Sequence, residues 1–250
     1  MGKHRKAALL AILIGVCLIV FSAQTLLFAK QVFDEGNAAY RALKEKVAAV
    51  GKLGSQAPSD AKTRVQTIDF KALRAINEDA VAWLYSPGTP IDYPVVKARD
   101  YNYYLYHLLD HAYNANGTLF IDYNNAPDFR DRLTVIYGHH MASEMMFTSL
   151  MGYKKQDYYK EHPFMYLQTE TEVYRVDLLY GCVVASGEWV NRAFMYEANL
   201  EELLTFAARN TTFTSDIAYQ KGDRVVVFST CSYEFNDARY VVLGVLKKLP

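Results

Sequence analysis

The chain opens with a long apolar block. Residues 7–29 contain no charged side chain, and only Ser22, Gln24 and Thr25 are polar. A helix rises 1.5 Å per residue, so a helix of this length spans the roughly 30 Å hydrocarbon core of a bilayer. The pattern therefore predicts a membrane-spanning helix.

Basic residues before this block indicate its orientation. Lys3, Arg5 and Lys6 precede it, and by the positive-inside rule such a cluster keeps the N-terminus in the cytoplasm. A cleaved signal peptide is the alternative, although its apolar region is normally about 7–15 residues long. We expect an uncleaved single-pass anchor in the cell membrane, with everything after Lys30 on the extracellular side.

The next part of the chain shows helical spacing. Residues 30–50 are rich in Ala, Lys and Glu with apolar side chains at helical intervals, which predicts a stalk helix, and the turn-rich residues 51–59 end it. Residues 69–76 predict a short second helix that begins near Asp69. We therefore divide the chain into a cytoplasmic tip and anchor (1–29), a helical stalk and linker (30–60), and a main domain (61–250).

In the main domain, apolar residues come in short β-branched and aromatic runs between turn signals. Eight runs are strand candidates: residues 82–85, 91–96, 118–122, 133–138, 164–169, 172–185, 224–230 and 239–248. Two helices are expected between them, at residues 142–153 and 197–210. Many short strands with turn signals are typical of a barrel or sandwich, so the fold class is mainly β.

Composition and charge narrow the class of protein. The 250 residues include 20 Tyr, 13 Phe and 2 Trp, which excludes a disordered chain. The 27 basic and 27 acidic side chains balance, and four of the basic ones flank the anchor. The remainder is mildly acidic and offers no basic face, so we expect no nucleic-acid partner.

Three cysteines differ in their sequence context. Cys17 lies in the apolar block, and Cys182 lies inside a long predicted strand, where a free Cys usually acts as a small apolar side chain. Cys231 comes at the end of a strand and before a polar stretch. By strand alternation it shares a face with Ser229. A thiol at a strand exit, near positive charge, is the setting in which Cys is reactive.

Two further residues stand at strand ends. Arg239 opens the strand that follows Cys231, and an antiparallel hairpin would place the two side by side; the alternative is a solvated Arg on a loop edge. His139 and His140 follow another strand, on opposite faces of it. No third ligand-type residue has metal-site spacing, so we expect neither a metal ion nor a cofactor.

These motifs together resemble a class B sortase. They are Tyr-Gly-His-His-Met at 137–141, Ser-Thr-Cys-Ser-Tyr-Glu-Phe at 229–235 and Asp-Ala-Arg-Tyr-Val-Val at 237–242. Stretches at 83–96, 103–105 and 120–125, and the helix before the Cys-bearing strand, resemble the same family. The resemblance covers about residues 30–250, and the anchor is also a family feature. It implies a closed eight-stranded sortase β-barrel with N-terminal helices.

The resemblance implies an activity and a set of roles. A sortase is a cysteine transpeptidase that cleaves a C-terminal sorting signal of a secreted protein after Thr and transfers the protein to an amine of the peptidoglycan precursor. Carried over to this sequence, Cys231 is the nucleophile, His139 the general acid and base, and Arg239 the residue that binds the oxyanion or positions substrate. Ser229, Leu105 and the pair Trp189 and Val190 correspond to positions that contact the sorting peptide, and His140 is not catalytic.

Other functions remain open at this point. The same Cys and His would also serve a peptidase that resolves the thioester with water. A non-catalytic surface-binding module on a stalk is an alternative from another class, and a metal-dependent hydrolase is a more distant one. The sequence leaves the sorting motif, which is of Asn-Pro-X-Thr or Leu-Pro-X-Thr-Gly type in this class, undetermined.

Overall fold

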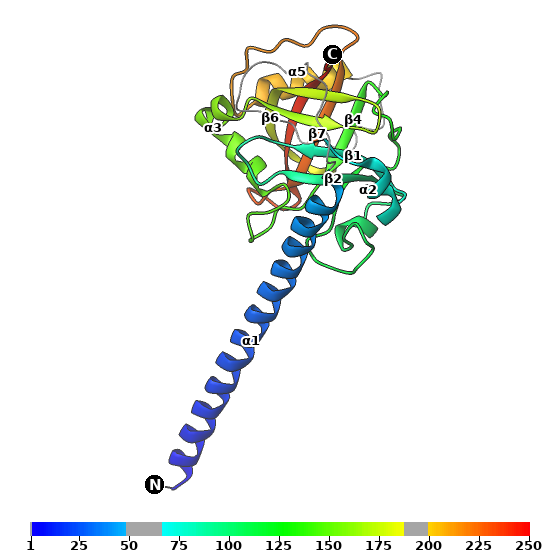
Figure 1. Ribbon diagram of the computed structural model, residues 1–250. Helices are drawn as coiled ribbons and strands as arrows, with labels where there is room; N and C mark the ends of the chain where they lie inside the picture. The colour runs from blue at the N-terminus through cyan, green and yellow to red at the C-terminus, as the bar shows by residue number, and fades with distance from the viewer. Residues whose placement is uncertain (1, 49–66, 188–199) are drawn as a thin grey trace.

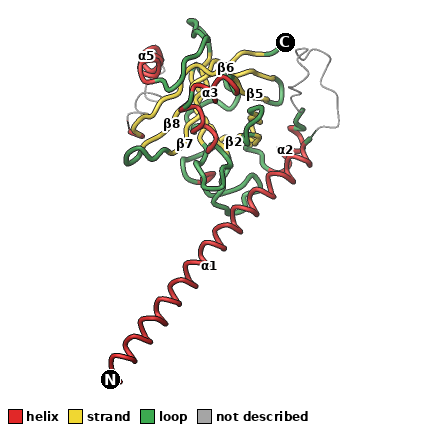
Figure 2. The backbone as a smooth tube through the Cα atoms, turned by 90° about the vertical axis from the view of Figure 1, so that its left-hand side faces the viewer, coloured by secondary structure: helices red, strands yellow, loops and turns green. Residues whose placement is uncertain are grey.

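One long helix forms the N-terminal part of the molecule and projects from the domain that follows it (Figures 1 and 2). The computed structural model describes residues 2–48, 67–187 and 200–250. Helix α1 (Gly2–Val47) contains no proline and is unbroken. Its apolar side chains are exposed, with Phe21, Leu26 and Phe28 all more than 60% accessible. By length and composition, α1 is able to cross a membrane.

Eight strands form a closed barrel, as the sequence predicts. They are β1 (Ala80–Tyr85), β2 (Asp92–Lys97), β3 (Leu119–Ile121), β4 (Leu133–Tyr137), β5 (Phe164–Gln168), β6 (Val173–Ala185), β7 (Arg224–Cys231) and β8 (Ala238–Lys248). Around the barrel the order is β1-β2-β3-β4-β7-β8-β6-β5. The β2/β3 and β4/β7 pairs are parallel, and the other pairs are antiparallel.

Side-chain alternation along the strands separates the barrel interior from its outer layer. On β7, Val226 and Phe228 belong to the central apolar cluster, whereas Val225 and Val227 pack in a second cluster on the outer face. Helix α5 (Leu200–Asn210) covers this outer cluster with the stripe of apolar residues that the sequence shows. A third cluster lies under the end of α1.

Short helices fill the connections. Helix α2 (Phe70–Ile76) begins after Asp69, whose carboxylate accepts a hydrogen bond from the Ala72 amide at 2.9 Å, as expected of an N-cap. A single 3₁₀ turn, η1 (Tyr103–Leu105), precedes β3. A longer 3₁₀ helix, η2 (Thr148–Lys154), and α3 (Gln156–Glu161) precede β5.

The prediction of a helix at residues 142–153 is wrong for the first half of that range. Glu144 and Met146 have φ of 59° and 55°, a left-handed conformation that an α-helix does not accommodate. The Thr148 hydroxyl instead accepts from the Met141 amide at 2.6 Å and donates to its carbonyl at 3.0 Å. These side-chain bonds close a turn before η2 begins. Of the helix expected at residues 197–210, the first three residues lie outside the described part of the chain.

Candidate active site

Strands β4 and β7 run in parallel and end at the same rim of the barrel. Their register pairs Tyr137 with Ser229. The contact continues past this pair, because the Gly138 amide donates to the Ser229 carbonyl at 3.1 Å and the Thr230 hydroxyl donates to the Gly138 carbonyl at 2.8 Å. One residue further along each segment come His139, two residues after the end of β4, and Cys231, the last residue of β7.

On its other side, Cys231 is paired with Arg239. The predicted hairpin of β7 and β8 is confirmed, and its last register pair joins these two residues. Both residues share the outer face with Val225 and Val241, which pack in the outer cluster. Cys231 thus lies at the rim between the segment that follows β4 and the start of β8. The side chains of Cys231, His139 and Arg239 are all partly buried.

The ring of His139 is held by a main-chain carbonyl. Its Nε2 lies 2.7 Å from the Leu105 oxygen, at the end of η1. A carbonyl only accepts hydrogen bonds, so Nε2 carries the hydrogen, and in the neutral ring Nδ1 is the basic nitrogen. The ring of Tyr106 lies 6.2 Å away, centroid to centroid. Leu105, predicted from the resemblance as a peptide-binding residue, thus contacts His139 through its main chain.

His140 makes a different contact from His139. Its Nδ1 lies 3.0 Å from the carbonyl of Cys231, so Nδ1 carries the hydrogen and fixes the main chain at the thiol-bearing residue. Its ring also packs on Tyr233, with centroids 5.1 Å apart. The two adjacent His residues therefore hold different parts of the rim.

The electrostatic environment distinguishes the described thiols of the domain. Cys182 is 1% exposed in the outer cluster, and burial raises the pKa of its thiol to about 12. Cys231 is at the rim and partly accessible. Near that rim, burial and then Asp122 raise the pKa of Tyr137 well above its usual range, while the positive charge of Arg239 lowers it. The guanidinium therefore acts on the side of the barrel where β4 ends.

Ser229 is buried next to this rim without a partner for its hydroxyl. The residue is 1% exposed, and its Oγ has no hydrogen bond among the described residues. A buried hydroxyl without a partner is costly, and in a native structure such a group calls for an explanation. Trp189 and Val190, the other predicted groove residues, lie outside the described part of the chain.

The loop after Cys231 is tied down by a network that the sequence did not reveal. Lys154 of η2 contacts Glu234 and lies 3.2 Å from the Ser232 hydroxyl, which itself bonds Glu234. Desolvation opposes ionisation of Glu234, but the hydrogen bonds from Lys154 and Ser232 prevail and lower its pKa to about 2. The Ser232 amide also donates to Ala238 at 3.0 Å, which closes the turn between β7 and β8. The network joins residues about 80 positions apart, so local spacing gives no signal for it.

The side chains at this rim suit one kind of chemistry. Within residues 2–48, 67–187 and 200–250, no group of three His, Cys, Asp or Glu side chains is arranged to hold a metal ion. The rim carries the thiol of Cys231, the guanidinium of Arg239 paired with it, and the imidazole of His139, which comes two residues after the end of the neighbouring strand β4. That set suits acyl transfer through a thioester, with a nucleophile, an acid-base group and a donor for a developing oxyanion.

Comparison with known proteins identifies the family. The protein-family model of the sortase domain matches residues 84–247, about two thirds of the chain. The chain belongs to the sortase family. This sortase is 29% identical to Sortase B of Listeria monocytogenes over 181 residues and 26% identical to Sortase B of Staphylococcus aureus over 183 residues. These alignments cover 71% and 72% of the chain, and 74% and 75% of the relatives.

Solved structures agree with this assignment. The crystal structure of S. aureus sortase B superposes with a TM-score of 0.72 at 25% identity, covering 85% of this chain and 99% of that one. Sortase B of Clostridium perfringens gives a TM-score of 0.66 at 26% identity, covering 71% and 98%. The predicted class B membership and the eight-stranded sortase barrel are confirmed, and membership supports a cysteine transpeptidase.

Proposed function

We propose that this sortase is a membrane-anchored transpeptidase in which Cys231, His139 and Arg239 carry the reaction. Its substrates are secreted proteins with a C-terminal sorting signal, and its acceptor is an amine of the peptidoglycan precursor. The observation that carries the proposal is the two-sided register of Cys231. It pairs with Arg239 on β8 and follows Ser229, whose partner Tyr137 is two residues before His139.

In the first half-reaction the Cys231 sulfur, as thiolate, attacks the carbonyl carbon of the Thr in the sorting signal. The carbonyl oxygen becomes an oxyanion, and Arg239, which stays charged, donates hydrogen bonds to it. When the intermediate collapses, the peptide C–N bond breaks and Nδ1 of His139 gives its proton to the departing amine. The products are a thioester on Cys231 and the released C-terminal tail.

In the second half-reaction an amine of the cell-wall precursor attacks the thioester. Neutral His139 accepts the amine proton at Nδ1, because Nε2 is occupied by the Leu105 carbonyl. The C–S bond then breaks, an amide forms, and the sulfur leaves as thiolate. The imidazolium and thiolate that remain are the starting state of the next cycle.

Four further positions are proposed to line the peptide site. The buried Ser229 hydroxyl lies beside the nucleophile without a partner, so a peptide amide or carbonyl would satisfy it. Leu105 holds His139 by its main chain, and its side chain packs partly buried on the third apolar cluster, so the part that stays accessible would contact the peptide. Trp189 and Val190 complete the set by resemblance to the family.

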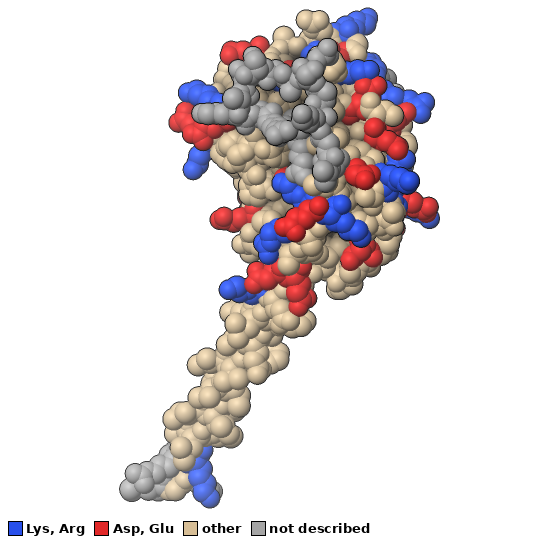
Figure 3. Space-filling view, viewed as in Figure 1, with Lys and Arg blue, Asp and Glu red and all other residues tan. Residues whose placement is uncertain are grey.

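The anchor brings the enzyme to its substrates. Residues 7–29 of α1 would cross the cell membrane, and in Figure 3 the projecting helix carries no charged side chain between its basic tip and the domain. By the positive-inside rule the tip is cytoplasmic and the barrel extracellular. Confining the enzyme and membrane-held substrates to one plane raises their effective concentration.

A peptide assay on the full chain in detergent micelles tests the proposed reaction. Fluorescent peptides with Asn-Pro-X-Thr or Leu-Pro-X-Thr-Gly signals are incubated with and without an amine acceptor, and products are identified by mass. We expect cleavage after Thr, a thioester on the intact protein and an amine-dependent ligation product. Cleavage without any amine-dependent product would instead support a hydrolytic peptidase.

Variants of the site residues provide the control. Cys231→Ala and His139→Ala are expected to abolish the thioester while the far-UV circular dichroism spectrum is retained, since both residues lie at the rim and not in the core. The matched control is Cys182→Ala, which removes the buried thiol of the outer cluster. Thioester formation in Cys231→Ala would overturn the assignment of the nucleophile.

A further inference from the structure

The part of α1 that follows the apolar segment is packed against the loop that contains η1. The Asn114 side chain donates to the Val32 carbonyl at 2.9 Å, and the Asn116 side chain donates to that of Asn37 at 2.9 Å. The contact is close, because a Cβ at Gly36 would lie 2.5 Å from Nδ2 of the Asn116 side chain and would displace it. The helix and the loop therefore form one packed unit.

At the centre of this contact is Tyr40, which is 6% exposed. Its hydroxyl donates to the Gly117 carbonyl at 2.5 Å and lies 2.9 Å from the Thr118 hydroxyl. Burial raises the pKa of Tyr40 above its usual range, so the phenol stays a neutral donor. The hydroxyl thus holds the end of the loop just before β3 begins.

Gly117 transmits this contact to Leu105. Its φ is +61°, and a Cβ there would lie 2.7 Å from the Leu105 oxygen. The Thr118 amide also donates to the Tyr104 carbonyl at 2.8 Å. The oxygen of Leu105, against which Gly117 packs, is the one that binds Nε2 of His139. Three consecutive contacts therefore join Tyr40 to the ring of His139.

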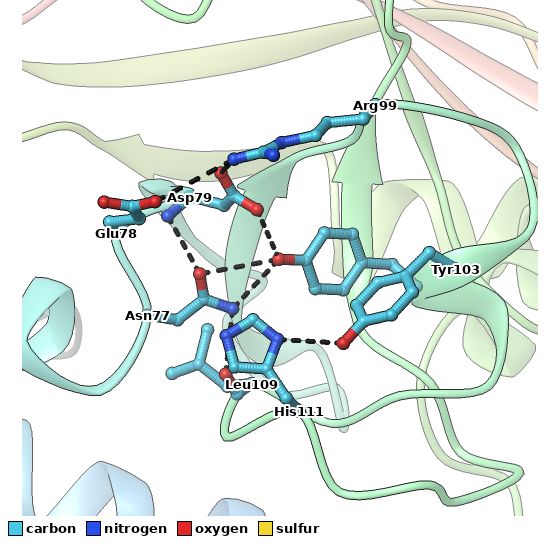
Figure 4. Close-up of polar contacts among 8 residues, drawn as sticks. Asn77, Glu78, Asp79, Arg99, Tyr103, Leu109 and His111 are labelled. Carbon is cyan, nitrogen blue, oxygen red and sulfur yellow. Dashed lines mark hydrogen bonds and ion pairs between the residues drawn. The ribbon is translucent and has the colours of Figure 1, made fainter.

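On its other side, η1 is held by Asn77 and Asp79, which precede β1 (Figure 4). The Tyr104 hydroxyl donates to Asp79 at 2.7 Å and accepts from the Asn77 side chain at 3.0 Å. Asn77 also donates to the Leu109 carbonyl at 2.9 Å, and Arg99 pairs with Asp79 at 3.8 Å. Because Asn77 and Asp79 hold η1 on one side, the position of the Leu105 carbonyl depends on the contacts of the loop with α1 on the other side.

A second path from Tyr40 reaches the main chain of His139. The rings of Tyr40 and Tyr93 meet edge to face, with centroids 5.2 Å apart. The Tyr93 hydroxyl accepts from the Met146 amide at 3.3 Å, and the next amide, that of Phe147, donates to the His139 carbonyl at 2.9 Å. Both the ring and the main chain of His139 are thus linked to one side chain of α1.

We propose that Tyr40 is a positioning residue, which orients the ring of His139 through Gly117 and the Leu105 carbonyl. The expected effect of Tyr40 on turnover rests on the proposed acid-base role of His139. The expected effect of Tyr40 on the orientation of the His139 ring does not depend on that role. It makes the N-terminal helix a part of the active-site support as well as an anchor. Without the Tyr40 hydroxyl, the Leu105 carbonyl shifts and no longer fixes the orientation and tautomer of the His139 ring.

The test uses Tyr40→Phe in the full chain in detergent micelles, because Phe keeps the ring that packs on Tyr93. We expect ¹⁵N NMR of the labelled histidines to show His139 with hydrogen on Nε2 in the parent protein and as a mixture of tautomers in the variant. Peptide turnover should show kcat lowered roughly tenfold with KM little changed, as expected of misorientation rather than lost binding.

Two comparison variants separate positioning from general destabilisation. Tyr159→Phe removes the hydroxyl of another buried tyrosine, which lies on α3 and bonds the Ser215 hydroxyl at 2.8 Å. This variant should change neither the tautomer of His139 nor kcat. Gly36→Ala favours the helix but separates it from Asn116, so it should reproduce the effect of Tyr40→Phe.

An unchanged His139 tautomer in both Tyr40→Phe and Gly36→Ala would overturn the proposal. If the tautomer changes but the parent protein shows no transpeptidation, then the proposed function fails and the positioning role stands. The two failures are therefore distinguishable.

Discussion

The cysteines of the domain differ in how much water reaches the sulfur, and this difference decides which of them reacts. Alkylation requires the thiolate. Burial raises the pKa of Cys182 to about 12, so its thiolate is scarce at neutral pH, whereas Cys231 lies at the rim beside Arg239 of β8. We expect iodoacetamide to label the native protein at Cys231 and to abolish turnover in step with labelling.

Peptide mapping by mass spectrometry measures this selectivity. Cys17 is shielded by the micelle if residues 7–29 cross the membrane, so it should be labelled only after the detergent is removed. Denaturant should expose Cys182, and denaturant without detergent should allow all three thiols to be labelled. Labelling of Cys182 before Cys231 in the native protein would contradict the assignment of the accessible thiol.

At Arg239, we expect a positive charge alone to be insufficient for catalysis. A guanidinium presents several N–H donors in a fixed plane, whereas an ammonium is a point charge on a flexible stem. We expect Arg239→Lys to lower kcat/KM on the order of 100-fold, the size of effect seen when one oxyanion donor is removed. Arg209→Lys, at an exposed position on α5, is the matched control and should keep the parent rate. Parent-like turnover by Arg239→Lys would show that Arg239 has another role.

At the scale of the strands, the β4/β7 junction depends on one side-chain hydrogen bond. Beyond the last register pair, the Thr230 hydroxyl donates to the Gly138 carbonyl inside the barrel wall. Thr230→Val has nearly the same shape but leaves this carbonyl without the donor, a loss of about 1–3 kcal/mol. We expect a corresponding fall in the free energy of unfolding, measured by urea titration, together with slower thioester formation.

Thr230→Ser tests whether the hydroxyl is responsible. It keeps the donor and loses only a methyl group, so it should recover most of the rate of thioester formation. A Ser variant as slow as the Val variant would assign the effect to packing at the rim instead of to the hydrogen bond.

The strands were readily predicted because each is a short apolar run between turn residues. All eight are found, with ends displaced by no more than two residues from the expected ranges. The helix predicted for residues 142–147 is wrong, although the Ala, Met and Glu of this segment favour a helix. The left-handed φ of Glu144 and Met146 and the hydrogen bonds of the Thr148 hydroxyl impose a turn instead. Local propensity was overridden there by side-chain to main-chain hydrogen bonds.

The candidate site was predictable where it depends on strand geometry. The alternation of side chains along β7 predicts which face of the strand Cys231 lies on, and the hairpin of β7 and β8 brings Arg239 beside it. The contact of His139 with Leu105 was not predictable, since a main-chain carbonyl has no residue-type signal and the two positions are 34 residues apart. Tyr40 was missed for the same reason, because its partners come from a loop more than 70 positions downstream.

At the scale of the whole molecule, α1 crosses the expected boundary between anchor and stalk at residues 29 and 30 without a break. Its contacts with the domain begin at Val32, where Asn114 binds the helix carbonyl. If residues 7–29 span the membrane, only a few residues separate the bilayer from the first contact with the domain. The barrel is then held at a fixed height above the membrane surface, with no flexible linker among residues 2–47.

This fixed height leads to a prediction about membrane-held substrates. Inserting seven alanines between Ala29 and Lys30 adds about two helical turns, lifts the domain by about 10 Å and nearly preserves its rotation about the helix. In lipid nanodiscs, we expect turnover of a free sorting peptide to be unchanged, because the contacts of Tyr40 with Gly117 are downstream of the insertion. Turnover of the same peptide tethered to a lipid by a short linker should fall several-fold. A longer tether that spans the added 10 Å should restore it, and equal rates for the parent and the insertion variant with the short tether would show that the height of the barrel does not govern access to substrate.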